Sequence, residues 1–245
     1  MHAIAENYGA QSRAWLEVPS LPYQHAFNFC AALTSRELSP VAILANDKVY
    51  LRELLKRVTG QIIVYLPEVT TLLGVDQRAA LGPEIIWDNV TVIDGDELQM
   101  PRPSRKTSFI WVEPQSAHLS QARMLLAALA PVQGRVIALT SNWLRSTLPE
   151  WQAGRSAHAV EKPLGVYATA RFLQSLGFLV QTTYGFQGPT SLVCGLLARL
   201  AALLGRTDMV DRLFVAQRRV LRVKRWQTPW SALSIIVARK EASCG

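Results

Sequence analysis

Acidic residues follow four short apolar runs of this sequence, each near the point where the run ends. They are Asp47, Glu68, Asp94 with Asp96, and Glu113. A carboxylate accepts hydrogen bonds from hydroxyl and N–H donors, so acids gathered at one place suit a small polar ligand. If the runs are parallel strands of one sheet, the strand ends meet at one edge and bring these acids together.

His118 is the best placed of the four histidines to act as a base toward a hydroxyl acceptor, since it starts a helical stretch close behind Glu113. A packing or capping role is the alternative for His118. No histidine pairs with Ser or Cys in a hydrolase motif. The three cysteines, Cys30, Cys194 and Cys244, are far apart and form no CxxC pair or Cys/His cluster, so we expect no metal site.

The apolar runs alternate with helical patterns, which predicts an α/β fold. We expect strands at 40–44, 61–66, 89–93, 108–112, 135–140, 179–184 and 232–240. We expect helices over 48–58, from 116 until Pro131, and from 166 until Gly177. The result is a doubly wound, mostly parallel seven-stranded sheet whose ligand lies beyond the strand ends, at 45–47, 68, 94–96, 113–118 and 140–143.

The length of 245 residues suits one such domain with additions. We expect residues 1–38 to form an N-terminal helical lid, with Phe27, Cys30 and Ala31 at helical spacing. Residues 39–245 then form the α/β domain. Within it, residues 186–226 are a helical insertion before the last strand, broken at Gly205 with Thr207 as an N-cap.

The composition, 49% hydrophobic and 18% charged, supports a buried core and argues against disorder. The opening residues lack the basic head and apolar run of a signal peptide, and the scattered cysteines fit a reducing compartment, so we expect a cytoplasmic protein. The most apolar segment, residues 192–204, carries Arg199 and is too short to span a membrane.

At several of these positions the sequence resembles class I S-adenosylmethionine-dependent methyltransferases, especially the small-molecule branch. NVTVIDGDELQMP is similar to the family's third-strand segment, and SFIWVEPQSAHL resembles the fourth strand and the loop after it. LLAALAPVQGRVIALT and LGVYATARFLQSLGFLV resemble the segments that lead to strands five and six. The likeness covers residues 40–185 and the last strand, and it rests on the order and spacing of these segments. It implies a Rossmann-like methyltransferase fold with S-adenosylmethionine as cofactor.

The resemblance also implies roles for the acids. Asp96 matches the residue that hydrogen-bonds the adenine amino group, and Asp94 takes that role if the register shifts by two. Glu68 matches the acid that accepts from the ribose hydroxyls, with a plain surface carboxylate as the alternative. Glu113 joins the cofactor-binding candidates after the fourth strand.

The first loop departs from the family, which has Gly-x-Gly-x-Gly where this chain has Ala45-Asn46-Asp47-Lys48-Val49. Each added Cβ crowds the methionine half of the cofactor. Asn46 and Asp47 are the non-glycine types that best tolerate a left-handed backbone. Asp47 either meets the cofactor's ammonium group or caps the helix that starts at Lys48. In the fourth strand, Ile110 stands where the family has an aspartate.

Aromatic residues are candidates to line an apolar acceptor pocket, with a core role as the alternative. They are Tyr8, Tyr23, Trp111, Trp143 and Trp151.

The formal net charge of +8 allows contact with anionic partners, and basic residues gather at 218–226 beside Trp226. This stretch suits an anionic membrane surface, where each basic group contributes about 1 kcal/mol, or it is a solvated helical cap. Nucleic acid is the weaker fit, because Glu113-Pro114-Gln115-Ser116 lacks the Asn-Pro-Pro-aromatic turn of base-modifying relatives.

We therefore expect a methyltransferase acting on a small, lipophilic acceptor. The alternative is a non-catalytic protein of the same fold that binds a protein partner or an anionic membrane.

Overall fold

The computed structural model describes the central part of the chain with gaps. The described residues are 21–35, 40–45, 47–66, 81–94, 107–129, 134–141, 164–186, 193–194, 196–198, 200–201, 204–220, 231 and 233–240. Asn46, Glu68, Asp96, Trp143 and Trp151 lie outside them, as do residues 1–20 with Tyr8.

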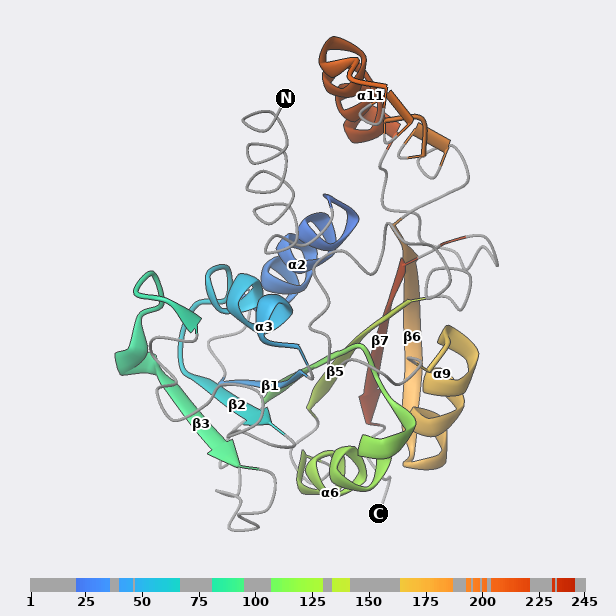
Figure 1. Ribbon diagram of the computed structural model, residues 1–245. Helices are drawn as coiled ribbons and strands as arrows, with labels where there is room; N and C mark the ends of the chain where they lie inside the picture. Colours follow the sequence, from blue (N-terminus) through green and yellow to red (C-terminus); the bar gives the residue numbers. More distant parts are fainter. Residues whose placement is uncertain are drawn as a thin grey trace.

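One seven-stranded sheet forms the centre of the molecule (Figure 1). Its strands are β1 (Val41–Ala45), β2 (Ile62–Leu66), β3 (Val90–Asp94), β4 (Ser108–Val112), β5 (Arg135–Ser141), β6 (Phe178–Gly185) and β7 (Leu233–Lys240). The order across the sheet is β3-β2-β1-β4-β5-β7-β6, and only β7 runs antiparallel to its two neighbours. The expected doubly wound, mostly parallel sheet is confirmed.

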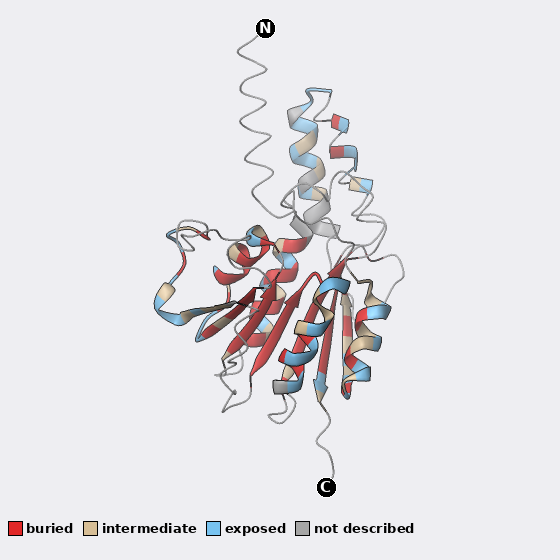
Figure 2. Cartoon of the chain, turned by 60° about the horizontal axis from the view of Figure 1, so that its bottom comes forward, coloured by how far each residue is buried: buried red, intermediate tan, exposed pale blue. Residues whose placement is uncertain are grey.

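Helices cover both faces of this sheet. The main ones on the sheet are α2 (Leu21–Thr34), α3 (Lys48–Leu55), α6 (Leu119–Leu129) and α9 (Val166–Ser175). The chain also has α11 (Thr207–Val220) and the short 3₁₀ turns η1 (Trp87–Asn89) and η2 (Ser116–His118). Helices α2 and α3 lie on one face, and α6 and α9 lie on the other (Figure 1). Figure 2 shows the buried residues concentrated in the central strands and on the inner sides of these helices.

The two central strands, β1 and β4, are buried along their whole length. Strands covered on both faces have no polar side, which explains the continuous apolar runs VAILA and FIWV in the sequence. Alternate residues of β1 point to opposite faces: Ile43 packs in the cluster with α2 and α3, whereas Leu44 packs in the cluster with α6 and α9.

Helix α2 packs on the first face through Tyr23, Phe27 and Cys30, which are fully buried. The expected helical spacing of Phe27, Cys30 and Ala31 is confirmed. Its last turn is fixed to the sheet, because Arg135 donates to the carbonyl of Leu33 over 3.1 Å. The division of the chain at residue 38 into lid and domain stays a prediction.

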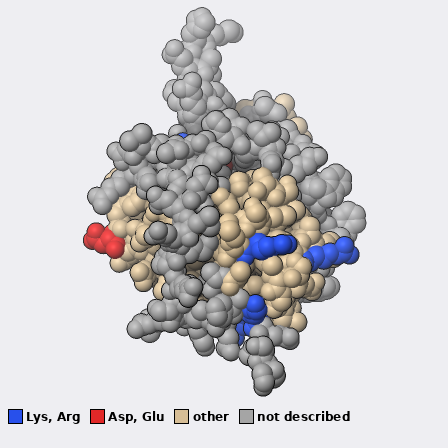
Figure 3. Space-filling model, turned by 90° about the horizontal axis from the view of Figure 1, so that it is seen from below, with Lys and Arg blue, Asp and Glu red and all other residues tan. Residues whose placement is uncertain are grey.

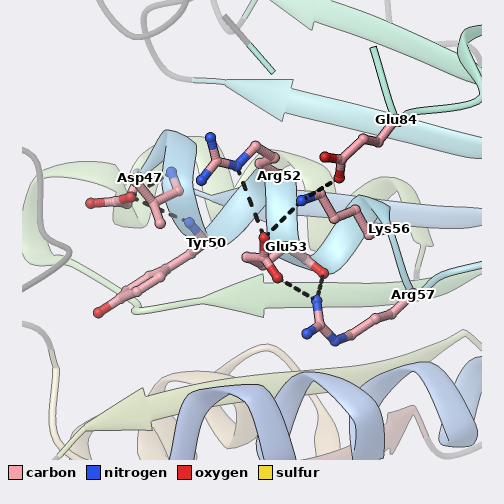
Figure 4. A network of polar contacts seen from close by, with 8 residues as sticks. Asp47, Tyr50, Arg52, Glu53, Lys56, Arg57 and Glu84 are labelled. Atoms are coloured by element: carbon pink, nitrogen blue, oxygen red, sulfur yellow. Dashed lines mark hydrogen bonds and ion pairs between the residues drawn. The ribbon is translucent and has the colours of Figure 1, made fainter. Parts of the chain in front are cut away.

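Helix α3 is held by a cluster of charged side chains around Glu53 (Figure 4). Glu53 pairs with Arg57 at 2.8 Å and with Lys56 at 3.1 Å, and Lys56 also pairs with Glu84 at 2.5 Å. Burial opposes ionisation of Glu53, but hydrogen bonds from Arg57 and Lys56 outweigh it and lower the pKa of that carboxyl. Arg57 also donates to Asn28 over 2.9 Å, so the cluster joins α3 to α2.

Two expected helix breaks are confirmed by backbone geometry. Gly177 ends α9 with φ of +78°, and Gly205 precedes α11 with φ of +70°. Such φ values are easy for glycine and costly for other residues. Thr207 was expected as the N-cap of α11, but it is the first residue of that helix rather than the residue before it.

Figure 3 looks at the molecule from below, where basic side chains of the described residues lie among uncharged ones, with an acidic side chain at the opposite edge. Among the described residues, no helix is long and apolar enough to cross a membrane.

Candidate functional site

The strand order reverses between β1 and β4. From β1 the chain continues to β2 on one side, and from β4 it continues to β5 on the other. The carboxyl ends of two such strands frame a crevice where ligands of doubly wound sheets bind. Ala45 pairs with Val112 as the last register pair of β1 and β4, so Asp47 and Glu113 follow the ends of the two strands between which the order reverses.

Asp47 caps helix α3. One of its carboxylate oxygens accepts from the backbone N–H of Val49 at 2.8 Å and from that of Tyr50 at 3.3 Å (Figure 4). The Asp47 backbone is extended, with φ of −135°. The capping role that the sequence left open is therefore confirmed. Because Asp47 satisfies two of the N–H groups at the start of α3, those groups are not available to an anionic ligand.

Glu113 directly follows β4 and is held in an unusual backbone conformation. Its φ is +52°, and its side chain is buried, with 5% of the residue exposed. The left-handed region costs a non-glycine residue about 1–2 kcal/mol, so the surrounding contacts must hold it there. The Glu113 N–H donates to the carbonyl of Leu139 over 2.8 Å, which fixes the turn to β5.

Two hydroxyl groups donate to the Glu113 carboxylate. Tyr23 of α2 donates to one oxygen, and Ser141 at the end of β5 donates to the other over 2.9 Å. A buried charge needs such donors, because water is not there to solvate it. We call Tyr23, Glu113 and Ser141 the edge cluster. It joins three elements at the carboxyl edge of the sheet: α2, β4 and β5.

Aromatic rings surround the edge cluster on the side of α2 and α3. The ring of Tyr23 stacks on that of Tyr50 at 4.4 Å between centroids, and Phe27 packs against both. Tyr50 follows the Asp47 cap by one helical turn, which carries its ring to the same edge. These rings provide an apolar wall beside two buried carboxylates.

The segment before α9 is attached to the loop after β4. Leu164 donates its N–H to the carbonyl of Pro114 over 2.6 Å, and its own carbonyl accepts from the Thr140 hydroxyl. Two consecutive residues of β5 therefore fix the loop after β4. Ser141 bonds directly to Glu113, and Thr140 acts through Leu164, which bonds to Pro114.

The structure brings together only part of the predicted set. Ala45, Asp47 and Glu113 lie at the switch point. Asp94 is the last residue of β3, two strands away from β1, and its side chain is not described. His118 ends η2, half-buried, at the start of α6 on the opposite face from α2. Asn46, Glu68 and Asp96 lie outside the described residues.

Two of the aromatic candidates lie on different faces of the sheet. Tyr23 is buried in the core cluster with α2 and α3, where it belongs to the edge cluster, and its place in an acceptor pocket stays a prediction. Trp111 is fully buried on the other face of the sheet, where its ring packs against Phe172 at 5.6 Å. Its expected place in an acceptor pocket is wrong, and the alternative core role holds, because alternation in β4 points Trp111 away from α2.

Sequence reasoning missed Tyr50, and it gave the range 140–143 without singling out Ser141. The signal for Tyr50 was its position three residues after the Asp47 cap, which places both at the start of one helix. The pairing of Ser141 with Glu113 had no local signal. Within the described part of the chain, no group of three His, Cys, Asp or Glu side chains could hold a metal ion.

Comparison with known proteins gives structural neighbours but no relatives by sequence. No protein-family model matches the chain, and no curated protein matches it. A methyltransferase from Thermotoga maritima, described as a possible histamine N-methyltransferase, superposes with a TM-score of 0.53 at 11% identity, covering 98% of this chain and 100% of that one. The glycopeptide N-methyltransferase MtfA, solved with sinefungin, gives a TM-score of 0.51 at 12% identity over 89% and 87%.

The pyocyanin biosynthetic protein PhzM has a TM-score of 0.48 and 14% identity over 88% of this chain, but this chain spans 54% of PhzM. The superpositions on the Thermotoga maritima methyltransferase and on MtfA, together with the strand order and the antiparallel β7, define the fold. It is the class I S-adenosylmethionine-dependent methyltransferase fold, as the sequence resemblance implied.

Proposed function

We propose that this protein is an S-adenosylmethionine-dependent methyltransferase that acts on a small, lipophilic acceptor. The observation that carries the proposal is the pair of buried carboxylates, Asp47 and Glu113, at the switch point of a sheet with this strand order. S-adenosylmethionine supplies an activated methyl group on a sulfonium. Its methionine end carries an ammonium, a sulfonium and one carboxylate, so it has a net positive charge, and carboxylates of the protein suit its two cationic groups.

The described residues have positioning roles in this proposal. Tyr23 and Ser141 hold the Glu113 carboxylate at a fixed place between β4 and β5. The rings of Tyr23 and Tyr50 exclude water from the same edge. Methyl transfer depends mainly on alignment of the acceptor with the methyl carbon, so a rigid, dry edge is the relevant property.

The adenosyl half of the proposed site rests on residues that the sequence singled out. Asp96 or Asp94 would hold the adenine amino group, and Glu68 would hold the ribose. The end of β3 at Asp94 lies next to the end of β2 at Leu66, the register that this arrangement needs. His118 stays a candidate base for a hydroxyl acceptor.

Isothermal calorimetry with S-adenosylmethionine and S-adenosylhomocysteine tests the proposal. We expect micromolar binding, at least about tenfold weaker in Asp96→Ala and in Glu113→Gln, which corresponds to about 1.4 kcal/mol or more. Glu84→Gln is the matched control, because Glu84 is an exposed acid away from the switch point. Absence of binding heat at millimolar ligand would refute the proposal.

A second candidate function is favoured by one specific observation. Ala45, Asp47 and Val49 occupy the three glycine positions of the family's first loop, and Asp47 uses the helix N–H groups itself. Side chains here reduce the space for the methionine half of a cofactor. A non-catalytic protein of this fold, binding a protein or an anionic membrane, would bind neither S-adenosylmethionine nor S-adenosylhomocysteine in the same titration.

A further inference from the structure

The segment between β6 and β7 leaves and rejoins the sheet beside the edge cluster. Gly185, the last residue of β6, pairs with Ser234 of β7, and Leu233 pairs with Ser141 of β5. Ser141 donates to Glu113. The segment 186–232 therefore begins and ends at the carboxyl edge of the sheet, where the candidate site lies. Figure 1 shows its helix α11 beyond α2, away from both faces of the sheet.

A stripe of large apolar side chains lies exposed on this segment. The described positions between 193 and 201 are helical, and the stripe consists of Val193, Leu196, Leu197, Leu200 and Leu204. Their spacing of three, four, seven and eleven residues from Val193 places them on one helix face. Each is between 41% and 76% exposed. We call these five residues the leucine stripe.

The neighbouring face of the same helix is buried, and the buried residues described on it are small. Ala198 is 1% exposed and Ala201 is 4% exposed. This arrangement is the reverse of an ordinary surface helix, which turns its large apolar residues inward. The helix end is well defined, since Arg206 donates its N–H to the carbonyl of Ala201 over 2.8 Å across Gly205. The leucines thus point outward because the small face is the one that packs.

Apolar exposure continues on α11, where Met209 and Val215 are also exposed. Arg206 and Arg212 are exposed among them. Over residues 193–226 the sequence has eight basic residues and two acidic ones, a surplus of six in a chain whose formal net charge is +8. Most of the net charge of the chain therefore lies in the segment that exposes the leucine stripe.

We propose that the leucine stripe docks on the surface of an anionic lipid bilayer. Large apolar side chains enter the interface between headgroups and acyl chains, and basic side chains nearby pair with anionic headgroups. The surplus of positive charge favours this occupant over a second copy of the chain, because two copies would bring like charges together.

Docking here would bring the carboxyl edge of the sheet, where the segment begins and ends, toward the bilayer. Resting on the proposed function, this identifies the acceptor class as a lipophilic molecule that partitions into the membrane. The methyl group would then pass from the sulfonium of S-adenosylmethionine to an acceptor drawn from the lipid phase. The S–CH3 bond would break, S-adenosylhomocysteine would be left, and the proton lost by the acceptor would go to water. The polar cofactor enters from water.

Vesicle flotation of the full chain tests the docking. The two vesicle types are pure phosphatidylcholine and phosphatidylcholine with about one third phosphatidylserine. We expect recovery mainly with the anionic vesicles. Leu196→Gln combined with Leu200→Gln should reduce that recovery about tenfold, since it removes apolar side chains that insert. Leu179→Gln is the matched control, because Leu179 is 52% exposed on β6 outside the segment and should leave recovery unchanged.

Arg206→Gln with Arg212→Gln should reduce the preference for anionic vesicles while retaining some apolar binding. Equal recovery with both vesicle types, or equal loss in the Leu179→Gln control, would overturn the proposal. So would a concentration-dependent dimer, seen by analytical ultracentrifugation without vesicles and abolished by the double leucine variant, because a second copy would then cover the stripe. Thermal melts establish that each variant is folded. Calorimetry with S-adenosylhomocysteine needs no vesicles, so failure of docking and failure of the proposed function are distinguishable.

Discussion

Replacement of Tyr23 by phenylalanine removes one hydroxyl from the buried carboxylate of Glu113 and leaves the aromatic ring in place. The ring contacts of Tyr23 with Tyr50 and Phe27 do not involve the hydroxyl. Glu113 keeps its hydrogen bond from Ser141 at 2.9 Å. The substitution therefore removes the hydrogen bond that joins α2 to the end of β4 and keeps these other contacts.

The size of the effect follows from burial. Tyr23 is 1% exposed and Glu113 is 5% exposed, so water does not replace the lost donor. A hydrogen bond to a charged group contributes about 1.5–3 kcal/mol. We expect the free energy of unfolding to fall by about 2 kcal/mol, which for a chain of this size lowers Tm by about 4–8 °C.

Urea unfolding of the wild type, Tyr23→Phe, Glu113→Ala and the double variant measures this effect as a double-mutant cycle. The coupling free energy should exceed about 1 kcal/mol, because each single variant removes the same contact. Tyr184→Phe is the control: Tyr184 is half-buried and packs its ring on Phe29 at 4.6 Å, so its loss should stay within about 0.5 kcal/mol. Strict additivity of Tyr23→Phe and Glu113→Ala would refute the role assigned to the contact.

Three further predictions concern parts of the fold away from the edge cluster. The pKa of Glu53 is lowered in the folded protein, so its ion pairs stabilise the fold at pH values above its unfolded-state pKa near 4.5. That stabilisation is lost as pH falls through the folded-state pKa. Glu53→Gln should flatten the acid side of a curve of Tm against pH, and an unchanged curve would contradict this. Burial raises the pKa of Cys30 to about 12, so its thiol should not react in the folded protein. In a chain with Cys194 and Cys244 replaced by serine, a thiol reagent should label only denatured protein. Rapid labelling of the native form would show that α2 is not packed as described. Gly177→Ala should lower the free energy of unfolding by about 1–2 kcal/mol in chemical denaturation, because φ at this position is +78°. The new Cβ would make only a normal van der Waals contact with Lys240 at 3.8 Å, so the backbone accounts for the effect. A neutral result would mean that the turn relaxes freely.

Much of the fold was predictable because its signals are local. Strand β4 was predicted with its observed bounds, and the other strands to within one residue at each end. Apolar runs without polar alternation indicate strands covered on both faces, and glycine at 177 and 205 marks the helix breaks. Helix α3 was predicted to Val58 but ends at Leu55, where the chain tightens into a turn in which the Arg57 N–H donates to the carbonyl of Leu54 over 3.0 Å.

The candidate site was predictable only as a position. A parallel sheet guarantees that residues after successive strands share one edge, which places Asp47 and Glu113 together whatever their roles. Their partners were not predictable. The cap at Asp47 has a local signal, because the N–H groups that donate to it belong to Val49 and Tyr50, two and three residues later. The left-handed backbone of Glu113 has no such signal in a sequence that reads Glu-Pro.

The sequence by itself determined the alternation of strands and helices, the start of α3 near Asp47 and the glycine breaks, because these depend on residues within a few positions of one another. Only the tertiary structure decided that Tyr23 donates to Glu113, since the two residues lie ninety positions apart. It also decided which face of an apolar helix packs. The spacing of the leucine stripe is the same whether leucine or alanine turns inward, and the choice depends on the space that the neighbouring elements leave.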